Sequence, residues 1–266
     1  MIREITLGQY YPGSSILHRL DPRIKLLGTL VYIVCLFISK NIFTYALAIL
    51  ALVSLVIISR VPFSHMVKGL RPIIFVLLLS VLFNLFLTQG DELFHIWRLS
   101  VTKQGIRQAA FMALRLICLI LGASLMTFTT TPNGLTDGIE SGLGFLKVIK
   151  IPVHELAMMM SIALRFIPIL TEELDKIIKA QMARGADLES GNLFKRAKSM
   201  VPLLVPLFIS AFRRATDLAS AMEARCYHGG KGRTRMHPLR FVFRDYIALM
   251  IIFAYIVGNV CLIVFI

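Results

Sequence analysis

The chain has 266 residues, of which 57% are hydrophobic and 17% charged, and its mean hydropathy is +0.76. Soluble domains usually carry about 25% charged residues, so this composition excludes an ordinary soluble enzyme. The 29 Lys and Arg against 15 Asp and Glu leave a net charge of +14, and we expect these charges to lie outside the apolar segments because ionised groups are costly inside a bilayer.

Charged residues concentrate between positions 132 and 244. This segment holds 17 Lys and Arg and 10 Asp and Glu, whereas the rest of the chain holds 12 and 5. We therefore predict a transmembrane domain over 1–131 with four spans, a cytoplasmic or interfacial coupling domain over 132–244, and a last transmembrane helix over 245–266. Basic surfaces can bind nucleic acid, but no aromatic–basic RNA motif or zinc-finger spacing is present, so nucleic acid is not an expected partner.

Apolar runs predict an all-α membrane protein with about five transmembrane helices. A membrane helix needs about 20 apolar residues, within a range of about 17–25. The first long run is broken near Lys40 and Asn41 and would be about 51 Å long as one helix, so it is predicted to form a hairpin. The spans are expected at 26–39, 42–59, 73–87, 106–128 and 246–266.

Two shorter apolar runs, 156–164 and 201–212, are predicted to be buried or interfacial helices, because runs of about 10–14 apolar residues rarely span a bilayer. The short basic loops determine the expected orientation. Seven Lys and Arg precede the first span or lie between the second and third, and basic loops stay in the cytoplasm. We expect a multi-pass protein of the cell membrane whose N-terminus and coupling domain are cytoplasmic and whose C-terminus is outside.

Side chains that could carry chemistry are scarce. The predicted spans hold no Asp, Glu or His, which weakens proton-coupled transport and intramembrane proteolysis. Arg115 is the exception; we expect it to bond to a group such as Asn84 or a backbone carbonyl, the alternative being an ion or substrate contact. A Walker loop needs G-x-x-x-x-G-K-[ST], and the segment 229–234 departs from it because Arg225 stands at the first glycine position. We predict no catalytic residue, no metal site and no cofactor in this chain.

The charged segment contains two long amphipathic helices, expected from Val153 to Arg184 and from Met200 to Arg225. Apolar residues recur at helical spacing in both, with charged residues between them, which is the pattern of a helix with one apolar stripe. Pro168 is expected to kink the first helix.

Both helices end on a similar tripeptide. An arginine in the last turn suits the negative end of the helix dipole, and its guanidinium can grip a carboxylate with two hydrogen bonds. One such ending would be merely a common C-cap, but two of them, 41 residues apart, look like two equivalent contacts for two similar partners. The endings are Ala183-Arg184-Gly185 and Ala224-Arg225-Cys226.

These endings, together with segments 8–14 (GQYYPGS), 17–23 (LHRLDPR) and 163–168 (ALRFIP), resemble the transmembrane coupling protein of energy-coupling factor (ECF) vitamin transporters, the CbiQ/EcfT family. The resemblance implies a complex with two cytoplasmic ABC-type ATPases, which bind ATP and Mg²⁺, and an exchangeable vitamin-binding membrane subunit. This chain would itself be no enzyme. By the same resemblance, Arg184 and Arg225 would each enter a groove on one ATPase.

Cys226 departs from the family pattern, which usually has glycine after both arginines. A side chain with a Cβ costs about 1–2 kcal/mol in the left-handed cap conformation. The second helix is therefore expected to run on to Gly229 or Gly230.

The apolar stripes are predicted to face the substrate-binding subunit, because large exposed apolar surfaces mark partner sites. ATP-driven closure of the ATPases would move the helix ends, and the long helices would carry this movement to the apolar stripes. The alternative is a dedicated CbiQ-like component of a cobalt or nickel importer. A membrane enzyme would need polar groups in the spans, and a channel would need a lined pore. The residues assigned to this interface are Leu156, Met159, Leu164, Leu170, Leu204, Phe208 and Phe212.

Overall fold

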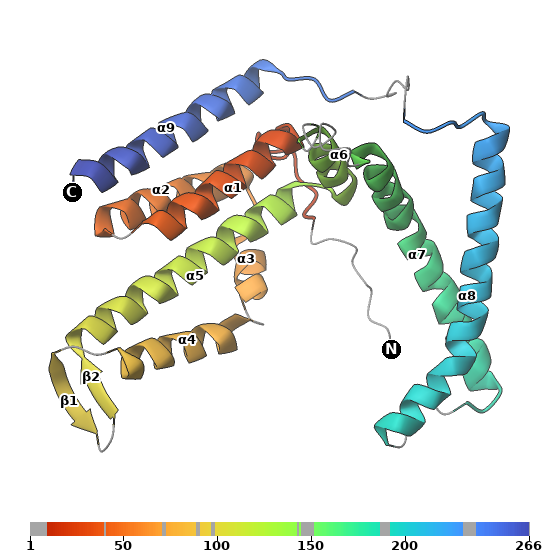
Figure 1. Cartoon of the computed structure of the whole chain (residues 1–266), viewed down its shortest axis with the longest axis horizontal. Helices are drawn as coiled ribbons and strands as arrows, with labels where there is room; N and C mark the ends of the chain where they lie inside the picture. Colours follow the sequence, from red (N-terminus) through yellow and green to blue (C-terminus); the bar gives the residue numbers. More distant parts are fainter. Residues whose placement is uncertain are drawn as a thin grey trace. The chain divides into compact units, whose positions relative to one another are not determined.

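The computed structural model describes residues 10–39, 41–70, 73–88, 91–96, 99–142, 144, 152–186, 192–230 and 238–265. These residues are almost all helical, apart from one short hairpin (Figure 1). The chain divides into two compact units: a membrane unit, Gly8–Ile139 with Leu239–Ile266, and an α7–α8 unit built on Glu140–Pro238. The domain boundaries expected at residues 132 and 244 stay predictions.

The membrane unit follows the apolar runs of the sequence. The expected hairpin is found, since α1 ends at Ile38 and α2 begins at Ile42; Lys40 lies outside the described residues. Two short helices and an antiparallel β-hairpin were not predicted. The elements are α1 (Pro22–Ile38), α2 (Ile42–Ser59), α3 (Phe63–Leu70), α4 (Ile74–Leu87), β1 (Glu92–Ile96), β2 (Leu99–Thr102), α5 (Lys103–Thr129), α6 (Pro132–Gly142), at which the two units join, and α9 (Phe243–Phe265).

Four helices of the described chain, α2, α5, α7 and α9, are long and apolar enough to cross a membrane, and α4 is a shorter apolar helix. Together with the helical architecture, this confirms an all-α membrane protein. The helix α1 has 17 residues and includes Arg23 and Lys25 at its start, where long cationic side chains can reach the interface. The helix α7 meets the length and composition needed for a span, so the interfacial position expected for 156–164 stays a prediction.

The core of the membrane unit lies where α1, α2 and α5 meet. Tyr32 and Leu36 of α1 and Tyr45 of α2 are buried there, beside Cys118 of α5. The helices approach closely because Gly122 of α5 has no side chain: a Cβ at this position would lie 2.6 Å from the Tyr32 ring. Small residues at helix contacts are typical of membrane bundles.

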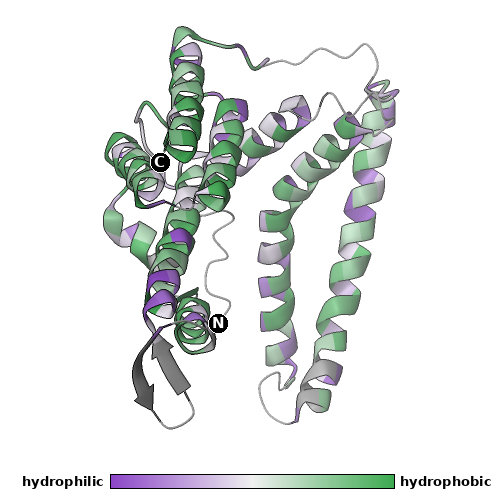
Figure 2. Ribbon diagram, turned by 60° about the vertical axis from the view of Figure 1, so that its left-hand side comes forward, coloured by the Kyte–Doolittle hydropathy of each residue, from purple (hydrophilic) through white to green (hydrophobic). Residues whose placement is uncertain are grey.

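The α7–α8 unit contains α7 (Val153–Ala183) and α8 (Leu193–Ala224). The two ribbons cross in Figure 1, whose colours show that they run in opposite directions, and they lie side by side in Figure 2. Both remain continuous through internal prolines, Pro168 in α7 and Pro202 and Pro206 in α8. Because the helices are antiparallel, their C-terminal ends lie at opposite ends of the pair.

Candidate functional site

The end of α7 is a Schellman cap. Arg184 is the C-cap residue, and its backbone N–H donates to the Ala180 and Gln181 carbonyls. Gly185 has φ +85° and donates to the Met182 carbonyl at 3.0 Å, while the Ala186 N–H donates to the Gln181 carbonyl at 3.0 Å. These two bonds define the motif and satisfy carbonyls that a helix end leaves unpaired.

The end of α8 repeats the two bonds that define this motif. Cys226 has φ +54° and donates its N–H to the Glu223 carbonyl at 2.8 Å, and the Tyr227 N–H donates to the Met222 carbonyl at 3.0 Å. The expectation that the helix runs on to Gly229 or Gly230 is therefore wrong: α8 ends at Ala224. Two capping bonds formed at the same register compensate for the unfavourable left-handed conformation of Cys226.

Both endings are available to a partner. All six residues of Ala183-Arg184-Gly185 and Ala224-Arg225-Cys226 are exposed. Within the described part of the chain, neither Arg184 nor Arg225 forms an ion pair. The structure thus holds two exposed guanidinium side chains on backbone caps of the same type, each at the negative end of a long helix.

A polar contact joins α7 to α8 partway along their length. Arg214 donates from Nη2 and Nε to Oε2 of Glu173 at 2.9 and 3.2 Å, and the Ser210 hydroxyl donates to Oε1 of the same carboxylate. The pKa of Glu173 is held below its usual range by these bonds, with the largest effect from the Ser210 hydroxyl and the next from Arg214. The amphipathic pattern did not single out these residues, because charged residues between apolar ones usually mark a solvated face.

The apolar side of α8 faces away from α7. Leu204, Phe208 and Phe212 are 47%, 60% and 72% exposed, and helical spacing at 3.6 residues per turn puts them on one side of the helix. Leu203, which is 7% exposed, and Ser210 lie on the opposite side. No side chain among the described residues covers the apolar side chains on this face of α8.

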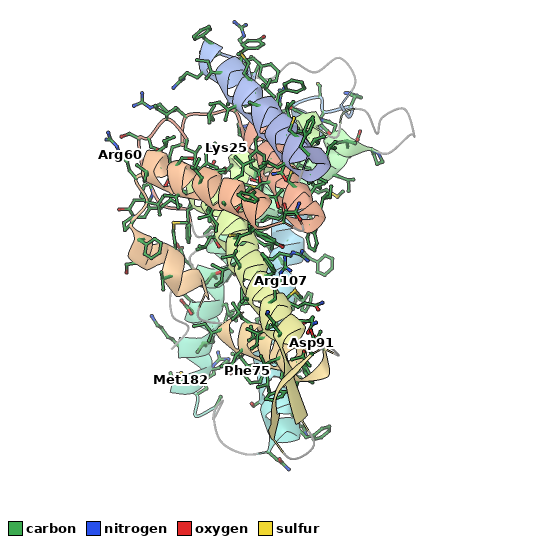
Figure 3. The ribbon with its side chains drawn as sticks, turned by 90° about the vertical axis from the view of Figure 1, so that its left-hand side faces the viewer. Lys25, Arg60, Phe75, Asp91, Arg107 and Met182 are labelled. Carbon is green, nitrogen blue, oxygen red and sulfur yellow. The ribbon has the colours of Figure 1, made fainter. Side chains whose placement is uncertain are left out.

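The residues of α7 assigned to the interface differ in how exposed their side chains are. Leu156 and Met159 are 46% and 54% exposed, whereas Leu164 and Leu170 are half-buried. Met182, labelled in Figure 3, is exposed in the last turn of this helix, near Arg184. The uncovered apolar surface of α7 therefore centres on its first half.

Arg115 of α5 is held by protein groups. Its Nε donates to the Tyr45 hydroxyl at 2.9 Å and its Nη2 to the Ser39 carbonyl at 3.2 Å, and the guanidinium lies 5.9 Å from the Tyr45 ring centre. The expected carbonyl partner is confirmed. Asn84, the other kind of partner considered for Arg115, donates instead to the Ser80 carbonyl one turn back in α4.

The start of α1 and the segment before it contact the end of α5, and we call this contact region the joint. Lys25, labelled in Figure 3, donates to the His18 carbonyl at 3.2 Å and to the Thr129 carbonyl at 2.8 Å, which ties α1 to the end of α5. His18 also contacts the Ser15 hydroxyl and the Tyr11 carbonyl through its two ring nitrogens, at 2.6 and 3.0 Å. These residues organise the start of the membrane unit.

Asp245 anchors α9 to the same joint. Its Oδ1 accepts from the Asp21 N–H at 3.0 Å and its Oδ2 from the Val242 N–H at 2.8 Å. The last helix begins at Phe243, earlier than the expected Tyr246, so its first turn contains a carboxylate that is 3% exposed. The expectation that the spans hold no acidic residue is therefore wrong for α9.

Over the described residues, no group of three or more His, Cys, Asp or Glu side chains could hold a metal ion. The two arginine ends and the apolar faces of α7 and α8 are the strongest functional features of the described chain.

Comparison with known proteins agrees with these features. The model of the cobalt transport protein family, CbiQ, matches residues 13–237. The chain is 52% identical to the energy-coupling factor transporter transmembrane protein EcfT of Thermosediminibacter oceani, over 97% of this chain and 98% of that protein. It is 55% identical to EcfT of Clostridium kluyveri, over 93% of each chain, and 50% identical to EcfT of Bacillus subtilis, over 92% of this chain and 93% of the other. The chain therefore belongs to the CbiQ family, and within it to the energy-coupling factor transporter transmembrane proteins, EcfT.

Proposed function

We propose that this chain couples ATP hydrolysis by two cytoplasmic ABC-type ATPases to vitamin uptake through an exchangeable substrate-binding membrane subunit. Its family membership makes it the non-catalytic transmembrane component of an ECF transporter. The observation that carries the proposal is the pair of exposed arginines, Arg184 and Arg225, on helix caps of the same type. Two similar ends suit two similar partners.

In this proposal each arginine enters an acidic groove of one ATPase. ATP and Mg²⁺ are bound by those subunits and not by this chain. An arginine–carboxylate contact contributes about 1.5–3 kcal/mol, and breaking one in a buried interface costs about 2–5 kcal/mol. Closure of the ATPases moves the ends of α7 and α8, and the long helices carry that movement toward the membrane.

The exposed apolar face of α8, with Leu204, Phe208 and Phe212, and the first half of α7, with Leu156 and Met159, would receive the substrate-binding subunit; the assigned Leu164 and Leu170 border this surface. Contacts between apolar side chains are non-directional. Such a surface suits a partner that is exchanged for others of similar shape. The specificity for a given vitamin would then lie in the partner.

The proposed topology places the N-terminus and the α7–α8 unit in the cytoplasm and the C-terminus outside. A cysteine introduced at Arg184, in a background lacking the exposed Cys226 and Cys261, tests it. Labelling by a membrane-impermeant maleimide only after the cells are opened is expected. Labelling from outside intact cells would contradict cytoplasmic ATPase contacts.

The central experiment replaces the two arginines in the complete transporter. Arg184→Ala and Arg225→Ala are each expected to weaken vitamin uptake, and the double substitution is expected to abolish it. The matched controls are Arg165→Ala in α7 and Arg213→Ala in α8, which are exposed arginines away from the helix ends. Uptake that persists in the double variant would overturn the role of the arginines.

The matching family model is described as a cobalt transport protein, so a dedicated cobalt or nickel importer is the second candidate. In such an importer the metal would bind another subunit. Purification of the tagged chain from its own cells separates the two. Recovery of several different vitamin-binding subunits supports the shared vitamin transporter, and recovery of one metal-binding subunit supports the alternative.

A further inference from the structure

The contact between α7 and α8 lies at matched positions of the two helices. Glu173 precedes Arg184 by eleven residues, and Arg214 precedes Arg225 by the same eleven. Each arm from the contact to its terminal arginine is therefore about 16 Å long at 1.5 Å per residue. The residues in contact are separated by 41 positions, the same offset that relates the two arginine endings.

The shared offset of 41 residues corresponds to a local twofold symmetry of the two helices. Two equivalent antiparallel helices that cross on a twofold axis bring the same position of each helix together, as in the self-complementary interface of a symmetric dimer. A repeated sequence would then place two like charges against each other, which is destabilising. Here α7 carries Glu172-Glu173 at the matched positions where α8 carries Arg213-Arg214. The difference in charge makes the crossing attractive.

Among the described residues, few buried apolar side chains lie close to this crossing. Among the residues of α7 and α8 whose burial is described, only Val153, Ala157 and Leu203 are buried. These residues lie far along the helices from Glu173 and Arg214. Close to the crossing, the described side chains are half-buried or exposed. Apolar contacts between such side chains are non-directional, so they would allow α7 to slide along α8. A guanidinium donating from Nε and Nη2, together with a hydroxyl bonded to the other carboxylate oxygen, restricts both position and rotation.

We propose that Glu173, Arg214 and Ser210 form a polar clamp that holds the crossing of α7 and α8 at equal distance from Arg184 and Arg225, so that the two helix ends move together. The clamp residues are positioning residues, since they act through the helices and not on a substrate. This inference rests on the proposed function, because the equal arms matter only if both arginines contact ATPases.

The test uses the complete transporter in proteoliposomes, with radiolabelled riboflavin and a riboflavin-binding subunit as the probe. Uptake and ATP hydrolysis are measured on the same preparation for Glu173→Gln and Arg214→Gln. Glu172→Gln and Arg213→Gln are the matched controls, because both side chains are exposed and form no ion pair within the described residues. The readout is the amount transported per ATP hydrolysed, which a general loss of folded protein does not change.

We expect both clamp variants to lower this ratio by at least about fivefold, the lower end of usual coupling effects, while the two controls keep the wild-type ratio. The reversed pair, Glu173→Arg with Arg214→Glu, is expected to restore it, because the ion pair re-forms across the same crossing. If Arg214→Gln fails to assemble, Arg214→Lys replaces it: it keeps the charge without the two-donor geometry and is expected to lower the ratio less.

The outcomes separate this inference from the proposed function. A wild-type chain that transports, with clamp variants that keep its ratio, overturns the clamp alone. A reversed pair that remains as defective as the single variants also overturns it. A wild-type chain that does not co-purify with ATPases overturns the proposed function, and with it the purpose of the clamp.

Discussion

The buried carboxylate of Asp245 is expected to hold the last transmembrane helix in place. The perturbation is Asp245→Ala. It removes an acceptor for two backbone N–H groups, those of Asp21 at 3.0 Å and Val242 at 2.8 Å. Hydrogen bonds to a charged group contribute about 1.5–3 kcal/mol each, so the substitution is expected to lower the free energy of unfolding by about 3–6 kcal/mol. Asp245→Asn retains one acceptor oxygen but is neutral and turns an amide NH2 donor toward the second backbone N–H, so it should lose more than half of that amount.

The assay is unfolding of the purified protein by sodium dodecyl sulfate in mixed micelles, followed by circular dichroism. Arg244→Ala is the matched control, because Arg244 is the exposed neighbour of Asp245 in the first turn of α9. A control of this kind usually stays within about 0.5 kcal/mol of the wild type. If Asp245→Ala were no more destabilising than Arg244→Ala, the idea of a joint between α9 and the start of α1 would be refuted.

Three further outcomes are expected. Cys226→Gly should stabilise the end of α8 by about 1–2 kcal/mol, because it removes a Cβ from the left-handed region, and slower hydrogen exchange in the last turn of α8 would show this. Gly122→Ala should destabilise the membrane unit by about 1–3 kcal/mol through overpacking against Tyr32, whereas Gly258→Ala, whose Cβ would make an ordinary 3.5 Å contact, should not; unfolding in detergent compares them. The pKa of Glu173 is held low, so its contact with Arg214 stabilises the α7–α8 pair fully above the ordinary pKa of about 4.3 and is lost only as pH falls below that value. Cross-linking between α7 and α8 should therefore be constant from neutral pH down to about pH 5. A loss of cross-linking within that window would contradict the direction of the pKa shift.

The apolar runs predicted the main helices because a bilayer imposes a length and a composition on anything that crosses it. The two arginine endings were also recognisable, since each is a local pattern of three residues repeated along the chain. The hairpin β1–β2 and the short helices α3 and α6 were missed, because their sequences carry no comparable apolar signal.

Sequence patterns did not predict contacts between residues that are distant along the chain. A backbone carbonyl was expected as a partner of Arg115, but nothing in the sequence indicated that it would be the carbonyl of Ser39, or that the Tyr45 hydroxyl would be the second partner. The start of α9 was placed too late because the tie between Asp245 and Asp21 spans 224 positions. No local rule indicates which of many polar residues will meet across such a separation.

Composition, periodicity and helix-end chemistry are local properties, so they sufficed to predict a helical membrane protein with two long amphipathic helices and two similar arginine ends. How those helices meet depends on the fold. Only the antiparallel crossing brings Glu173 to Arg214, and only the backbone at Cys226 shows that α8 ends as α7 does. Helix ends can be recognised along the chain, whereas the point at which two helices touch depends on packing between them.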